Sequence, residues 1–180
     1  MPQAPHADPS DTQAPARPLR SPLPPPRAVD DPEALERDLR AVVRGEVRFD
    51  AKSRALYATD ASPYRIAPIG VVVPLDEEDV RAAVGVAARH GAPILPRGGG
   101  TSLAGQTVGE ALVIDVSKHL TRVLEVNVEE RWVRVQPGVV RDQLNRLLAP
   151  HGLQFTPDVA TTDRANVGGM VANNSSGTHS

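Results

Sequence analysis

Cysteine is absent from the 180 residues. Without a thiol, these residues cannot form a disulfide scaffold, a thiolate zinc site, a cysteine-ligated iron–sulfur cluster or a cysteine nucleophile. A basic excess is also lacking, because 20 Lys and Arg residues stand against 22 Asp and Glu residues, for a net charge of −2. This balance disfavours a module that binds the phosphate backbone of nucleic acids. The longest apolar runs, residues 69–74 and 111–116, are too short to cross a bilayer.

Proline is concentrated at the amino-terminal end of the chain. Ten of the eighteen prolines fall within residues 1–32, where the apolar side chains are mainly isolated alanines. Such a stretch cannot bury enough surface to offset the entropy lost on ordering, and it lacks the apolar core of a signal peptide. We therefore expect a disordered proline-rich segment over residues 1–31 and a folded domain over residues 32–180.

Helix and strand signals alternate along the folded part. Asp31-Pro32-Glu33 is typical of a helix start, and Gly45 is expected to end that helix. A second helix is expected from Asp76 to Gly91 and a third from Val140 to Pro150, while residues 46–68 have a mixed pattern typical of loop. Short strands are expected at 71–73, 93–96 and 111–116, with a hairpin over 123–128 and 132–136. The buried helix faces are expected to carry Val80, Ala83, Val84, Ala87 and Ala88, and Val140, Leu144, Leu147 and Leu148. This order predicts an α+β or mixed α/β fold.

A glycine loop follows the strand at 93–96, with the sequence Arg97-Gly98-Gly99-Gly100-Thr101-Ser102. Glycines let backbone N–H groups converge on an anion, and the two hydroxyls could donate as well. The Arg97 side chain could supply charge or point to solvent. A tight turn between strands is the alternative, but three glycines exceed what a turn needs. We therefore favour a phosphate site, in which a Cβ at Gly99 would intrude on the phosphate oxygens.

Two familiar phosphate motifs fail on particular residues. The Rossmann fingerprint needs a third glycine at position 103, where Leu103 stands. The Walker loop needs a lysine where Gln106 stands, so an ATPase or GTPase is disfavoured. The remaining interpretation is a diphosphate that is held without being hydrolysed. A second cluster of small polar residues, at 168–177, could approach a flat ligand. Taken alone, it is better explained by a loop and a weak helix start.

Four segments, in this order and spacing, resemble the FAD-binding domain of the vanillyl-alcohol oxidase and p-cresol methylhydroxylase (PCMH) type. They are residues 72–74, 94–106, 135–139 and 157–177. The ending Ala104-Gly105-Gln106 and the tract 173–177 are most similar to the D-lactate and D-2-hydroxyglutarate dehydrogenase branch, which includes glycolate oxidase subunits. The resemblance covers about residues 33–180. It implies a PCMH-type domain of two α/β subdomains, truncated at its C-terminal end.

The resemblance also implies the cofactor and its contacts. FAD is expected, bound non-covalently, because no histidine lies in the glycine loop, where some family members attach the flavin. The five histidines show no metal-ligand spacing, so no metal site is expected. No catalytic residue is identified. The implied cofactor-binding residues are Pro96, Arg97, Gly98, Gly99, Gly100, Thr101, Ser102, Gly105, Gln106, Pro137, Gly138, Val139, Pro157, Asp158, Gly168, Gly169, Asn173, Ser175 and Gly177.

The implied function is that of an FAD-dependent dehydrogenase or oxidase acting on a CH–OH group. A D-2-hydroxy acid (D-lactate, D-2-hydroxyglutarate or glycolate) would pass a hydride to flavin N5. The substrate would bind through a missing downstream domain, so the fragment alone is expected to be inactive. The electron acceptor is not identified; a downstream Fe–S domain would fit. We expect a cytoplasmic protein, or one peripheral to the inner face of the membrane. The alternatives are a non-catalytic nucleotide- or flavin-binding module, and an interaction protein that works through its proline-rich segment.

Overall fold

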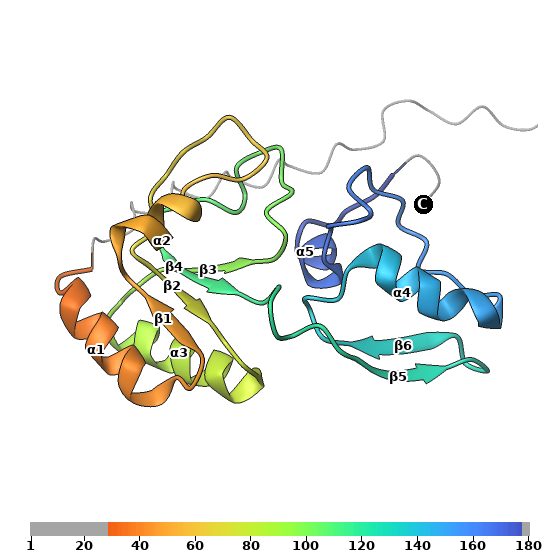
Figure 1. The fold of residues 1–180 in the computed structure, drawn as a ribbon, viewed down its shortest axis with the longest axis horizontal. Coiled ribbons are helices and arrows are strands. Elements are labelled where there is room, and N and C mark those ends of the chain that lie inside the picture. Colours follow the sequence, from red (N-terminus) through yellow and green to blue (C-terminus); the bar gives the residue numbers. More distant parts are fainter. Residues whose placement is uncertain (1–28, 178–180) are drawn as a thin grey trace, which may run out of the picture.

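The computed structural model describes residues 29–177, which form two lobes with separate sheets and cores (Figure 1). Residues 1–28, where most of the predicted disordered segment lies, are outside this range. Within that predicted segment, Val29 packs against the core and Asp31 caps the first helix. The first lobe (residues 29–116) contains α1 (Pro32–Val42), β1 (Glu46–Arg48), α2 (Ala51–Leu56), β2 (Gly70–Val73), α3 (Glu77–Arg89), β3 (Ile94–Arg97) and β4 (Leu112–Asp115). The second lobe (residues 123–177) contains β5 (Val123–Asn127), β6 (Trp132–Val135), α4 (Arg141–Leu148), the 3₁₀ helix η1 (Ala149–His151) and α5 (Val167–Ala172).

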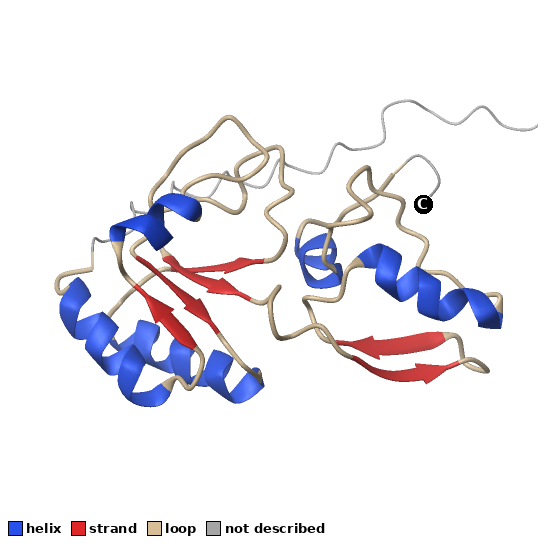
Figure 2. Cartoon of the chain, in the orientation of Figure 1, coloured by secondary structure: helices blue, strands red, loops and turns tan. Residues whose placement is uncertain are grey.

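The first lobe is built on a four-stranded sheet in the order β1-β2-β4-β3 (Figure 2). The β1–β2 pair is antiparallel, and β2–β4 and β3–β4 are parallel. Val72, Leu112 and Ile114 share one core cluster with residues of α1 and α3. Val71, Val73 and Val113 form the other cluster, against Tyr57 and Leu95. Every position of β2 and β4 is buried, because both faces of the inner strands are covered. The predicted mixed class is confirmed.

The predicted helix boundaries are largely confirmed by capping contacts. The Asp31 carboxylate accepts a hydrogen bond from the Ala34 N–H at 2.9 Å, and Pro32 is the first residue of α1. Asp76 caps α3 by accepting from two N–H groups of its first turn, at 3.0 and 3.1 Å. Gly91 follows α3 with a φ of +62°, a backbone conformation that favours glycine.

Three expectations for the first lobe are wrong. Helix α1 ends at Val42, and Gly45 does not end it; a Cβ at Gly45 would overlap the carbonyl oxygen of Val73, so close approach to β2 explains this glycine. Helix α3 is rotated relative to the expected face: Val84 and Ala88 are exposed, and Val86 is buried in their place. Residues 46–68 contain β1 and α2, which are too short for their periodicity to show.

Asp79 in the first turn of α3 is the most buried charged residue among those described, with 1% of its surface exposed. Its carboxylate accepts hydrogen bonds from the backbone N–H groups of Arg44, Gly45 and Leu75 at 2.9–3.1 Å. The Arg44 Nε lies 3.2 Å away. Burial opposes ionisation, but these donors outweigh it and hold the pKa of Asp79 below its ordinary value. Asp79 therefore ties α3 to the connection between α1 and β1.

The second lobe packs the β5–β6 hairpin against α4. The hairpin is antiparallel, as predicted, and its core includes Val139, Leu144, Leu148 and Val167. Leu147, expected on the buried face of α4, is 42% exposed. None of the helices within residues 29–177 is long and apolar enough to cross a bilayer.

Candidate functional site

The glycine loop (residues 97–107) leaves the end of β3 and runs toward the second lobe (Figure 1). A Cβ added at Gly98 would lie 2.6 Å from the Asn166 Oδ1, and one at Gly99 would lie 2.5 Å from the Arg164 carbonyl oxygen. The sequence reasoning expected phosphate oxygens to occupy the space beside Gly99. The structure shows that backbone of the second lobe occupies it, so these two glycines let the lobes touch.

The other predicted cofactor segments contact one another within the second lobe and where the chain enters it. A Cβ at Gly138 would overlap the Val116 carbonyl oxygen, and one at Gly168 would lie 2.5 Å from the Pro137 Cβ. A Cβ at Gly177 would overlap the Asp158 carbonyl oxygen. The fold thus brings together segments that are far apart in the sequence, and their glycines are the points of contact.

The glycine loop carries a run of backbone donors without acceptors, as the turn at residues 159–163 also does. Within the part of the chain that the structure describes, the N–H groups of residues 99–103 donate no hydrogen bond. Gly100 adopts a φ of +65°, which turns the backbone within this run. Consecutive unsatisfied N–H groups in such a turn create a site for an anion, because their partial positive charges add.

Arg97 closes the loop at its base. Its Nη1 donates to the carbonyl oxygens of Tyr57 (3.1 Å) and Thr107 (3.0 Å), and its Nη2 donates to that of Thr59 (2.7 Å). The guanidinium carbon also lies 5.3 Å from the centroid of the Tyr57 ring. The guanidinium therefore holds the loop, and its direct contact with a diphosphate remains a prediction.

The tip of the loop is closed by Ser102. Its hydroxyl donates to the Gln106 Oε1 at 2.8 Å and accepts from the N–H groups of Ala104 and Gln106 at 3.2 and 3.3 Å. Gly105 completes the turn with a φ of +71°. The hydroxyl expected to bind phosphate is thus engaged within the loop. Thr101 is half-buried in the loop, and Pro96 lies in β3.

The remaining predicted residues lie in the second lobe. Val139 is 1% exposed, and its side chain belongs to the core of the second lobe, next to Gly138 in the chain. Arg141 donates from Nε to the Pro157 carbonyl oxygen at 2.6 Å and forms an ion pair with Asp158 at 3.2 Å. Gly169 lies in α5, where a Cβ would meet nothing within 4 Å. Asn173 follows α5, and its Nδ2 donates to the Ser175 Oγ at 3.2 Å.

Asn166 lies at the junction of the two lobes, and sequence reasoning missed it. The residue is 4% exposed, and its Nδ2 donates to the Gly138 carbonyl oxygen at 2.7 Å. Its Oδ1 is the one buried side-chain polar atom within residues 29–177 without a hydrogen-bond partner. An unsatisfied buried acceptor costs about 1–3 kcal/mol, and this oxygen lies against Gly98, where an added Cβ would be 2.6 Å from it. An asparagine before small apolar residues carries no distinctive sequence signal.

A second polar group supports the loop from the first lobe. The Tyr57 hydroxyl donates to the Asp115 Oδ2 at 2.6 Å, and the Ser117 N–H and hydroxyl donate to the Asp115 Oδ1. Burial raises the pKa of Tyr57, and the hydrogen bond to the Asp115 carboxylate raises it further. Tyr57 is therefore held as a neutral donor beneath Arg97.

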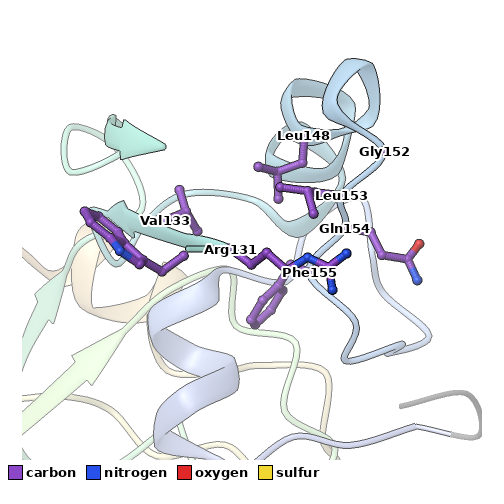
Figure 3. A pocket seen from close by; sticks show the side chains of 8 residues that line it. Arg131, Val133, Leu148, Gly152, Leu153, Gln154 and Phe155 are labelled. Carbon is purple, nitrogen blue, oxygen red and sulfur yellow. The ribbon is translucent and has the colours of Figure 1, made fainter. Parts of the chain in front are cut away.

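A pocket of about 310 Å³ opens elsewhere, between β6 and the η1 turn (Figure 3). Its lining includes Val133, Leu148 and Phe155, which belong to the second-lobe core. The pocket contains none of the predicted cofactor residues. We therefore place the candidate site at the lobe junction. Within the described range, no group of three or more His, Asp or Glu residues is arranged to hold a metal ion.

Comparisons with known proteins find one family model and several relatives. A family model described as "FAD binding domain" matches residues 68–180. D-2-hydroxyglutarate dehydrogenase of Pseudomonas putida is 46% identical over 152 residues, which cover 81% of this chain and 15% of that protein. Glycolate oxidase subunit GlcD of Bacillus subtilis is 32% identical over 139 residues, which cover 75% of this chain and 30% of that subunit. The chain thus spans less than a third of either relative.

Solved structures share the fold at lower identity. An alkyldihydroxyacetonephosphate synthase superposes with a TM-score of 0.71 at 24% identity, covering 80% of this chain and 29% of that one. p-Cresol methylhydroxylase with bound substrate superposes with a TM-score of 0.62 at 18% identity, covering 77% of this chain and 28% of that one. These likenesses confirm the predicted PCMH-type architecture.

Proposed function

Because the chain belongs to the FAD binding domain family, we propose that it is the cofactor-binding part of an oxidoreductase that acts on D-2-hydroxy acids. FAD is the cofactor of this family. The identity to a D-2-hydroxyglutarate dehydrogenase favours D-2-hydroxyglutarate as the first substrate to test, with D-lactate and glycolate next. The observation that carries the proposal is the run of free N–H groups at residues 99–103, placed at the lobe junction.

The residues present fit FAD at its diphosphate. The free N–H groups of the glycine loop suit these anionic oxygens.

The contribution of this chain is binding and orientation. In the proposed site, the glycine loop would hold the diphosphate. Gly138 and Gly168 would support it indirectly, because they let Val116 and Pro137 pack closely against them. The polar residues after α5, Asn173 and Ser175, offer side chains toward the ring system. When bound, the flavin supplies a hydride acceptor for the carbinol carbon of the substrate. We assign substrate binding and proton transfer to a further part of the full-length protein, since the relatives are much longer.

The first test is FAD binding followed by reduction. The full-length protein should retain FAD after gel filtration and show flavin absorbance near one equivalent. Addition of D-2-hydroxyglutarate under anaerobic conditions should bleach that absorbance within seconds to minutes, because a hydride is transferred to the flavin. The L-enantiomer is the matched control. Flavin that stays oxidised with each of the three hydroxy acids would favour the alternative, a non-catalytic flavin-binding module.

Non-covalent attachment is a separate prediction. No histidine lies in the glycine loop, so acid precipitation of the loaded protein should release the flavin to the supernatant. Absorbance of the supernatant against that of the pellet measures the fraction released. Yellow colour that remains with the denatured pellet would show a covalent bond at another residue.

A further inference from the structure

We propose that Asp60 is a positioning residue that fixes the shape of the glycine loop for the cofactor. It does so as part of a buttress segment (residues 57–64) in the connection between α2 and β2. The inference rests on the proposed function, because the loop is taken as the diphosphate site. Neither the family match nor the sequence reasoning gave these residues a role.

The buttress segment holds the base of the glycine loop. Arg97 donates to the carbonyl oxygens of Tyr57 and Thr59, at 3.1 and 2.7 Å. Because these bonds use backbone carbonyls, the path of the segment decides where the guanidinium lies. The same guanidinium reaches the Thr107 carbonyl oxygen, so it joins the two ends of the loop.

Asp60 holds the far end of the loop from the opposite side. Its Oδ2 accepts from the Thr107 hydroxyl at 2.9 Å and from the Thr107 N–H at 3.3 Å. Its Oδ1 accepts from the Ser62 N–H at 2.8 Å, which fixes the carboxylate within its own turn. One carboxylate oxygen therefore connects the buttress to Thr107, and the other fixes the carboxylate within the buttress.

The middle of the loop is held by the next residue of the buttress. The Ala61 N–H donates to the Gly100 carbonyl oxygen at 3.0 Å. In a trans peptide the C=O and the following N–H point in opposite directions. The bond to Ala61 therefore turns the Thr101 N–H away from the buttress, within the run of free donors. Asp60 adjoins Ala61, so loss of its anchor would release this peptide plane.

A carboxylate beside an anion site works against binding through its charge. Asp60 is thus expected to act through its hydrogen bonds, and the neutral isostere should keep most of the anchor. Asn supplies one acceptor oxygen, which can serve Thr107, and gives up the acceptor for the Ser62 N–H. Asp60→Asn keeps an acceptor for Thr107 and removes the charge, whereas Asp60→Ala removes the anchor. A direct electrostatic or chemical role would remove this difference, and Asp60→Asn would then weaken FAD binding as much as Asp60→Ala.

The experiment is a titration of FAD into the full-length apoprotein, followed by flavin fluorescence well below the melting temperature. Asp60→Ala should raise the Kd about tenfold, and Thr107→Val should do the same. Thr107→Ser and Asp60→Asn should stay within about threefold of the wild type. The double variant Asp60→Ala/Thr107→Val should bind no more weakly than either single variant, because both remove one shared interaction.

Asp50→Ala is the matched control. Asp50 caps α2 in the same lobe by accepting from the Ser53 N–H at 2.9 Å, and it has no contact with the loop. Its loss should lower stability and leave the Kd unchanged. An unchanged Kd in Asp60→Ala, or an equal rise in Asp50→Ala, would overturn the positioning role. If Asp60→Ala does not fold, the Thr107 variants decide the question. A wild type without FAD affinity would instead remove the proposed function itself, and this inference with it.

Discussion

Replacing Gly99 with valine should abolish FAD binding by the full-length protein while leaving most of its secondary structure in place. Even the first side-chain carbon would lie 2.5 Å from the Arg164 carbonyl oxygen, a backbone atom that cannot rotate away. The loop would have to withdraw from the second lobe and carry the free N–H groups of residues 99–103 with it. Flavin absorbance per protein after gel filtration measures the loss, and far-UV circular dichroism follows the fold.

Gly85→Ala provides the control for that experiment. Gly85 lies in α3, where the nearest atom to an added Cβ is the Arg89 Nη1 at 3.9 Å. Alanine is the better helix former, so this variant should keep full flavin occupancy and gain up to about 1 kcal/mol in stability. A Gly99→Val protein with the same occupancy as Gly85→Ala would contradict the site. The glycine loop would then be better explained as a turn between strands.

Removal of the Asp79 carboxylate should cause the largest loss of stability. Asp79→Ala leaves the N–H groups of Leu75, Arg44 and Gly45 without their acceptor in a partly buried position. Each such loss is costly, so the free energy of unfolding should fall by about 3 kcal/mol. Urea denaturation measures it. Glu78→Ala, one residue earlier on the exposed side of α3, should change stability by less than about 0.5 kcal/mol.

The same carboxylate should contribute to acid sensitivity. Because the pKa of Asp79 is lowered by folding, its contribution is complete above the unfolded pKa and is lost as the pH falls through the folded one. The difference in unfolding free energy between the wild type and Asp79→Ala should therefore shrink below about pH 4. A difference that stays constant to pH 2 would contradict the lowered pKa.

Local chemistry explains which parts of the fold were predictable. Asp31 and Asp76 were identified as caps, and Gly91 as a helix end, because each acts on backbone groups within a few residues. The buried face of α3 was misplaced because Asp79 is buried, and a charged residue is normally assigned to the surface. Its partners come from residues 44–45 and 75, so only the tertiary structure identifies them.

The candidate site likewise contains residues that were predictable from the sequence and residues that were not. The glycines were predictable as places of close backbone approach, but what approaches them was not: the Gly99 neighbour is Arg164, far along the chain. Asn166 and Asp60 were missed because each acts through hydrogen bonds to residues that are distant in the sequence, and each lies in an irregular segment. Such residues show neither periodicity nor a spaced pattern, so a single sequence does not distinguish them from ordinary loop residues.

The two lobes have separate hydrophobic cores, and Gly98 and Gly99 are points where they touch. None of the core clusters among the described residues includes both lobes, so each lobe can open as its own cooperative unit. A dinucleotide held at the junction would bind only when both lobes are folded and docked. The ligand would then link two melting events into one, and its free concentration would set how much of the chain unfolds in a single transition.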